Sequence, residues 1–211
     1  MARSSRARDQ LIDSARDLFY AHGYAAVGVQ EICDQAGVNK GSFYHFFPSK
    51  RDLLAAVIDS HAAWLRGVLE RSAVSKLSPL ERIRRVFVLV GEFDQEVRRR
   101  TGQTIGCPIG NLAGELVAQD EGVRRRLEAV LGDGVAFFER QLCEAAAEGA
   151  IEVEDHRARA QAIMGYLEGL QLLAAARNEP GLLEALADGA LRLAGAEASA
   201  VMNPRGQERE R

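Results

Sequence analysis

Residues 23–50 decide the fold, and they read GYAAVGVQEICDQAGVNKGSFYHFFPSK. Apolar residues recur there at helical spacing in two short runs, about residues 29–36 and 39–46, with Gly37 between them. Neither run is long enough to bury its apolar face alone. The pattern therefore predicts two short helices joined by a tight turn, each packed against other parts of the chain.

The two predicted helices each have an apolar inner face, formed by Val29, Ile32, Cys33 and Ala36 and by Val38, Phe43 and Phe46. The outer face of the second helix is polar and consists of Asn39, Lys40, Gly41, Ser42, Tyr44 and His45. A short helix of this kind, placed end-on in a major groove, can donate to base edges and phosphates. Gly41 permits a close approach of the backbone, and Tyr44 can reach a phosphate or a thymine methyl. Alternatively, Tyr44 and His45 are merely surface aromatics.

The flanking sequence continues the helical pattern on both sides. An apolar stripe from Leu11 to Phe19 predicts a helix that stops at His22-Gly23. Ser49, with Asp52 three residues later, starts a helix that runs to about residue 71. Residues 1–51 carry seven basic and five acidic side chains, whereas the whole chain has a net charge of −3. This excess is small, so charge alone does not identify the protein.

The rest of the chain is also helical in pattern, and no segment alternates as a half-buried strand would. Start and stop signals place helices at about residues 79–100, 108–119, 120–149, 156–178 and 180–198. The predicted fold is all-α, with about nine helices. We expect a helix-turn-helix domain over residues 1–50, a sensing and dimerisation bundle over 51–200, and a disordered tail over 201–211.

Residues 7–55 closely resemble the TetR family of transcriptional regulators. The resemblance implies that the Asn39–Phe46 helix reads DNA, with contacts from Lys40, Gly41, Ser42, Tyr44, His45 and Lys50, and further contacts from Asn39, Gln30 and Arg6. The family usually has Ser or Thr immediately before Val29, where this chain has Gly28. Glycine still caps a helix, but it has no hydroxyl for a phosphate contact.

The last two predicted helices are rich in leucine. By the same resemblance they pair with their mates in a homodimer, with Leu170, Leu173, Leu186 and Leu191 at the interface. An intramolecular core is the alternative interpretation of these leucines. A two-fold dimer presents two recognition helices about 34 Å apart, so the expected operator is palindromic.

Residues 104–116, TIGCPIGNLAGEL, resemble a segment of the TetR repressors that respond to electrophiles and acrylate. Cys107 precedes Pro108 at a predicted helix start, where the helix dipole favours a reactive thiolate. Alternatively, Cys107 is a small buried packing residue. Asn111, Trp64, Phe87 and Phe137 are further candidates for an effector pocket, with core packing as their alternative.

Other classes of protein find little support in the sequence. Three widely spaced cysteines argue against a disulfide framework or a zinc site and favour the reducing cytoplasm. No apolar run reaches the ~18 residues of a membrane span. An enzyme would need a nucleophile with its base or a phosphate loop, and an architectural DNA-binding protein would need a more basic face. We therefore predict a cofactor-free and metal-free repressor, released by an electrophile or oxidant at Cys107 or by a non-covalent hydrophobic inducer.

Overall fold

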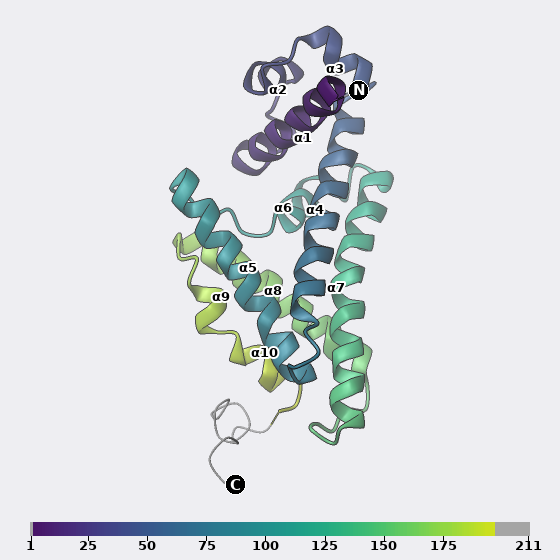
Figure 1. Ribbon diagram of the computed structural model, residues 1–211, viewed down its shortest axis with the longest axis vertical. Coiled ribbons are helices and arrows are strands. Elements are labelled where there is room, and N and C mark those ends of the chain that lie inside the picture. The colour runs from purple at the N-terminus through teal and green to yellow at the C-terminus, as the bar shows by residue number, and fades with distance from the viewer. Residues whose placement is uncertain (1, 197–211) are drawn as a thin grey trace. The chain divides into compact units, whose positions relative to one another are not determined.

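The computed structural model describes residues 2–196, with side-chain burial from residue 6 onward. Its regular elements over that range are ten α-helices (Figure 1). The described residues form two compact units, one of residues 2–65 and 107–130 and the other of residues 66–106 and 131–196. None of the described helices has an apolar stretch able to cross a bilayer. The predicted all-α class is confirmed.

The first unit begins with α1 (Ala2–His22), α2 (Val29–Ala36), α3 (Lys40–Phe46) and the first part of α4 (Lys50–Ser72). The predicted stripe of α1 is buried, with Leu11 and Ala15 fully enclosed, and α1 packs against both α2 and α3. Gly37 ends α2 in the left-handed conformation at φ 64°, a backbone geometry that glycine adopts without a Cβ clash.

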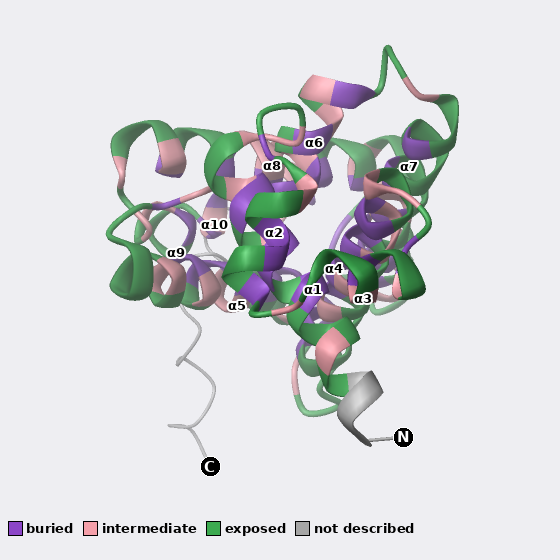
Figure 2. Ribbon diagram, turned by 90° about the horizontal axis from the view of Figure 1, so that it is seen from above, coloured by how far each residue is buried: buried purple, intermediate pink, exposed green. Residues whose placement is uncertain are grey.

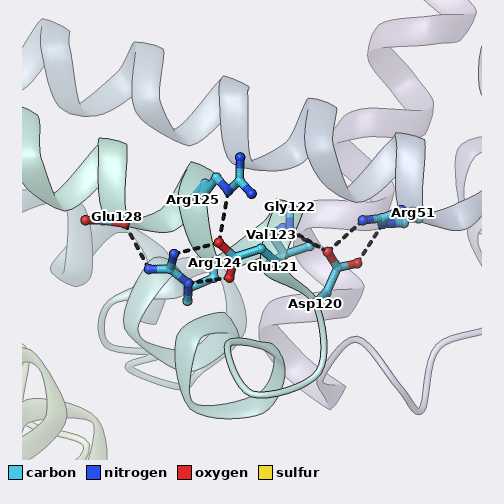
Figure 3. A network of polar contacts seen from close by, with 8 residues as sticks. All are labelled: Arg51, Asp120, Glu121, Gly122, Val123, Arg124, Arg125 and Glu128. Atoms are coloured by element: carbon cyan, nitrogen blue, oxygen red, sulfur yellow. Dashed lines mark hydrogen bonds and ion pairs between the residues drawn. The ribbon is translucent and has the colours of Figure 1, made fainter.

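Two later segments return to this unit, namely α6 (Pro108–Leu116) and the beginning of α7 (Glu121–Ala147). Asp120 begins α7 by accepting hydrogen bonds from the backbone N–H groups of Gly122 and Val123. The same carboxylate forms an ion pair with Arg51 on α4 at 2.6 Å (Figure 3). The start of α7 is therefore fixed to the start of α4 within the first unit.

The second unit contains α5 (Pro79–Thr101), α8 (His156–Arg177), α9 (Leu182–Ala185) and α10 (Asp188–Leu193), with the remainder of α4 and α7. Ser78 and Glu81 form a reciprocal capping box at the start of α5, as their spacing predicts. The core of the second unit contains aromatic side chains: the Phe87 ring lies 6.4 Å from that of Phe138 and 5.9 Å from that of Tyr166. The helices carry both buried and exposed residues (Figure 2).

One predicted helix is wrong: the segment expected over residues 180–198 is two short helices, α9 and α10. The Tyr166 hydroxyl donates a hydrogen bond to the Leu186 carbonyl at 3.0 Å. The Gly189 N–H bonds to that same carbonyl at 2.9 Å, a three-residue turn in place of an α-helical bond. A side chain of Gly189 would overlap the Tyr166 ring. The break therefore comes from a tertiary contact. The predicted tail, residues 201–211, lies outside the described residues.

Candidate DNA-binding interface and sensor segment

The α3 helix carries most of the predicted DNA contacts. Asn39 caps it, since its Oδ1 accepts a hydrogen bond from the Ser42 N–H at 2.8 Å. Phe43 is fully buried behind it, whereas Lys40, Gly41, Tyr44 and His45 are exposed and Ser42 is half-buried. Half of the Tyr44 surface is exposed, and the ring stands edge-on to Phe43 at 5.1 Å. The helix therefore has an anchored back and an open polar front.

The inner faces of α2 and α3 are largely as expected. Ile32, Cys33, Ala36 and Phe43 are buried, but Val29, Val38 and Phe46 are only half-buried. Two of the flanking candidates, Gln30 and Arg6, are exposed, and Gln30 donates a hydrogen bond to Asp34 at 2.8 Å.

Lys50 is held inside the first unit. Its ammonium donates to the backbone carbonyls of Tyr24 at 2.9 Å and Val27 at 2.8 Å, and it lies 4.2 Å from the centre of the Tyr24 ring. Partial burial lowers the pKa of Lys50, with Glu115 opposing that shift. Two of the three N–H donors of Lys50 therefore hold the connection between α1 and α2.

Glu115, near the end of α6, binds the backbone N–H groups of the same connection between α1 and α2. Its carboxylate accepts hydrogen bonds from the backbone N–H of Tyr24 at 2.8 Å and of Ala25 at 2.6 Å. We call the contacts of Lys50 and Glu115 with residues 24–27 the turn clamp. The sequence analysis did not identify Glu115, because its partners are about ninety residues away and no local pattern links them.

Cys107 is the N-cap of α6, and its sulfur accepts a hydrogen bond from the Gly110 N–H at 3.4 Å. The residue is partly exposed, whereas Cys33 is buried and Cys143 is exposed. Burial raises the pKa of the Cys33 thiol, which disfavours its reactive thiolate. The sulfur of Cys107 thus lies where the predicted helix start would place it.

The five sensor candidates are divided between the two units. Cys107, Asn111 and Trp64 belong to the first unit, and Phe87 and Phe137 to the second. Trp64 packs against the buried His61 at 5.0 Å, and burial lowers the pKa of His61 to about 4. Phe87 and Phe137 are fully buried. Among the described residues, no group of His, Cys, Asp or Glu is arranged to hold a metal ion.

The four predicted interface leucines differ in exposure. Leu170 and Leu191 are buried within the protomer. Leu173 and Leu186 are exposed, and so is Leu172 at 67% of its surface, a residue the sequence analysis did not select. The α8 surface therefore retains apolar side chains available to a partner.

The two parts of the chain match known families separately. Residues 11–57 match the bacterial regulatory proteins of the tetR family, and residues 79–189 match the tetracyclin repressor-like C-terminal domain. A capped recognition helix packed on two further helices defines a helix-turn-helix DNA-binding regulator. With both matches in place, the chain belongs to the TetR family.

Several known proteins are similar to this chain. An uncharacterised HTH-type transcriptional regulator from the lacX 3′ region of Lactococcus lactis subsp. lactis is 28% identical over 183 residues, 84% of this chain and 87% of that protein. The transcriptional regulator AcuR of Cereibacter sphaeroides is 35% identical over 129 residues, 61% of this chain and 57% of AcuR. The crystal structure of regulatory protein TetR from Rhodobacter sphaeroides is 31% identical with a TM-score of 0.78, covering 89% of this chain and 98% of that one.

Proposed function

We propose that the chain is a transcriptional repressor that binds a palindromic operator as a homodimer, with α3 of each protomer in the major groove. The open front of α3 carries this proposal: Lys40, Tyr44 and His45 are exposed on a helix whose back is anchored by the buried Phe43. Exposed donors on a rigid helix are what reading base edges requires. Gln30 and Arg6 supply flanking phosphate contacts.

Lys50 acts mainly as a positioning residue in this function. Two of its donors are bound to carbonyls of the turn clamp, which leaves one N–H for a phosphate. Asn39 uses its carbonyl oxygen as the α3 cap and retains its amide nitrogen for DNA. Both residues therefore combine a structural role with a contact.

A small-molecule effector releases the operator by acting on α6. Cys107 begins this helix and Glu115, near its end, holds the connection that leads into α2. Modification of Cys107 by an electrophile or oxidant, which the helix start favours, is thereby linked to the helix-turn-helix. The alternative is a non-covalent inducer that displaces α6 without any role for the thiol.

The first experiment tests operator binding. DNA enriched by the protein from a random pool supplies the operator, and its affinity is then measured for variants. We expect Tyr44→Ala to weaken specific binding by about 1–3 kcal/mol. Lys40→Ala should also weaken it, whereas Lys76→Ala, an exposed lysine of the second unit, should not. Equal operator affinity for the wild type and the three variants would show that α3 does not contact the operator.

The second experiment separates the two modes of release. Operator affinity is measured before and after a small electrophile for the wild type, Cys107→Ser and Cys143→Ser. If Cys107 is the sensor, Cys107→Ser should hold the operator through treatment, whereas Cys143→Ser, which removes an exposed thiol, should respond like the wild type. Release that persists in Cys107→Ser would overturn the role of the Cys107 thiol.

A further inference from the structure

The hydroxyl group of Tyr20, in the last turn of α1, is buried without a hydrogen-bond partner among the described residues. An unmade hydrogen bond of this kind destabilises the folded protein. Most buried hydroxyl groups in proteins are satisfied, so an exception requires a physical reason. Tyr166, by comparison, donates its hydroxyl hydrogen to a backbone carbonyl in the second unit.

The Tyr20 hydroxyl lies within electrostatic range of the Cys107 sulfur, and both residues belong to the first unit. Burial is the largest influence on the Tyr20 hydroxyl and raises its pKa; Arg16 opposes this, and Cys107 and Asp17 add to it. The phenol therefore remains a protonated donor near neutral pH. The backbone agrees with this proximity, because Glu115 of α6 bonds to residues 24 and 25, directly beyond the end of α1.

The sulfur atom is positioned for reaction but does not satisfy the phenol. It accepts a hydrogen bond from Gly110 at the α6 start, where a negative charge is favoured. The Tyr20 hydroxyl has no hydrogen bond to it, even with the longer reach that sulfur allows. An oxygen atom attached to the sulfur, or carried a few bonds beyond it, would be a stronger acceptor than a thiol.

We propose that Tyr20 is a positioning residue that responds to the modification of Cys107. Its hydroxyl group donates a hydrogen bond to an oxygen atom that the modification adds. This inference rests on the proposed function and adds its selectivity: the effective reagents attach an oxygen acceptor at Cys107. Because α1 packs on α2 and α3, a new bond at Tyr20 acts on the helix that supports the recognition helix.

Two reagent classes supply such an oxygen. With an α,β-unsaturated carbonyl compound, the thiolate forms a bond to the β-carbon, the π electron pair moves to the α-carbon, and that carbon takes a proton from water. With hydrogen peroxide, the sulfur bonds to one oxygen as the O–O bond breaks. The sulfur is oxidised by two electrons to a sulfenic acid, and the departing hydroxide is protonated to water. Both products carry an oxygen acceptor, whereas a methylthio group carries only sulfur, a weak acceptor.

The test uses the full chain with Cys33→Ala and Cys143→Ser, so that Cys107 is the one remaining cysteine. Methyl acrylate, hydrogen peroxide and methyl methanethiosulfonate are applied separately, and intact mass gives the modified fraction. Operator affinity is compared with that of the same protein before modification, with and without Tyr20→Phe. Tyr166→Phe is the matched control, because it removes a phenol hydroxyl from the second unit.

We expect full modification by methyl acrylate or peroxide to lower the affinity about tenfold or more in the parent and in Tyr166→Phe. In Tyr20→Phe the loss should shrink to about the loss that the methylthio group causes. A response to only one of the two oxygen-bearing reagents identifies the reagent class that supplies the oxygen acceptor and supports the proposal. Equal release with and without Tyr20→Phe overturns the role of Tyr20 and leaves the proposed function standing. A fully modified parent that keeps its operator overturns the thiol switch and the role of Tyr20 together, while operator binding itself stands.

A second measurement does not depend on the folding of Tyr20→Phe. The chain has four tyrosines, so labelling with [13Cζ]tyrosine gives four signals, and single Phe variants of Tyr24, Tyr44 and Tyr166 assign Tyr20 by elimination. We expect the Tyr20 signal to shift in the methyl acrylate or peroxide form and to stay in place in the methylthio form. An unshifted Tyr20 signal in both oxygen-bearing forms overturns the proposal.

Discussion

Asp94 on α5 is a carboxyl group without exposed surface, and neither oxygen has a hydrogen-bond partner among the described residues. Burial raises the pKa of Asp94 to about 7. The folded protein therefore holds the proton over a range in which the unfolded chain has lost it. The contribution of this proton to the free energy of unfolding is fully present below the unfolded pKa near 3.8. It is lost as the pH rises through about 7.

Asp94→Asn should remove this pH dependence, because an amide has the same shape and no charge to bury. The free energy of unfolding of the variant, relative to the wild type, should rise by roughly 2–3 kcal/mol between pH 5 and pH 7. His61, whose pKa is lowered to about 4, makes folding more favourable as the pH rises in both proteins and so cancels in the difference. Denaturant unfolding at fixed protein concentration provides the measurement. Asp133→Asn, at an exposed site, is the control. A difference in unfolding free energy between Asp94→Asn and the wild type that does not change with pH would contradict the interpretation.

Gly28 is a second residue whose surroundings define a test. It caps α2 at φ −91° and ψ 155° without a side-chain hydrogen bond, and a Cβ added there would meet no atom within 4 Å. Gly28→Ser should stabilise the protein by a few tenths of a kcal/mol through a new cap. It should also tighten operator binding if the hydroxyl reaches a phosphate. Thermal unfolding and operator affinity measure the two effects. Gly28→Ala supplies the Cβ alone, and equal behaviour of the two variants would exclude a role for the hydroxyl.

Of the segments that follow α4 in the chain, α6 holds the connection into α2 through Glu115 in the turn clamp. Carboxylate hydrogen bonds are stronger than neutral ones. Glu115→Gln keeps the shape but presents an N–H where an acceptor is needed. We expect a loss of about 1 kcal/mol in stability and weaker operator binding in the absence of effector. Glu128→Gln removes the same charge from the α7 surface, where Glu128 pairs with Arg124 at 3.0 Å (Figure 3). If both variants bind the operator like the wild type, α6 does not act through this clamp.

The helices also show which information the sequence contains. The predicted bounds of α2 agree with the structure because glycines mark both of its ends. The division between α9 and α10 was missed because a contact from Tyr166 decides it. Likewise, apolar residues lie on several faces of α8, so spacing could not separate the buried Leu170 from the exposed Leu173. Patterns within one turn were predictable, whereas contacts between distant segments, such as Glu115 with Tyr24, were not.

For the whole molecule, the exposed leucines of α8 provide a test of assembly. In the proposed homodimer, Leu173→Arg would bring an unpaired charge into the apolar contact between protomers. We expect it to yield a monomer in sedimentation at micromolar concentration and to weaken operator binding, because a single protomer presents only one recognition helix. Val74→Arg is the matched control, since Val74 is exposed to a similar extent, 40% against 43%. A dimer that survives Leu173→Arg would place the interface elsewhere.

The turn clamp also makes two backbone amides informative about the state of α6. The N–H groups of Tyr24 and Ala25 are covered by the Glu115 carboxylate. Their hydrogens can exchange with solvent deuterium only when that carboxylate withdraws, since an amide exchanges when its hydrogen bond opens. The exchange rates of these two amides therefore measure how often α6 releases the connection into α2 in the free protein, without DNA or effector bound.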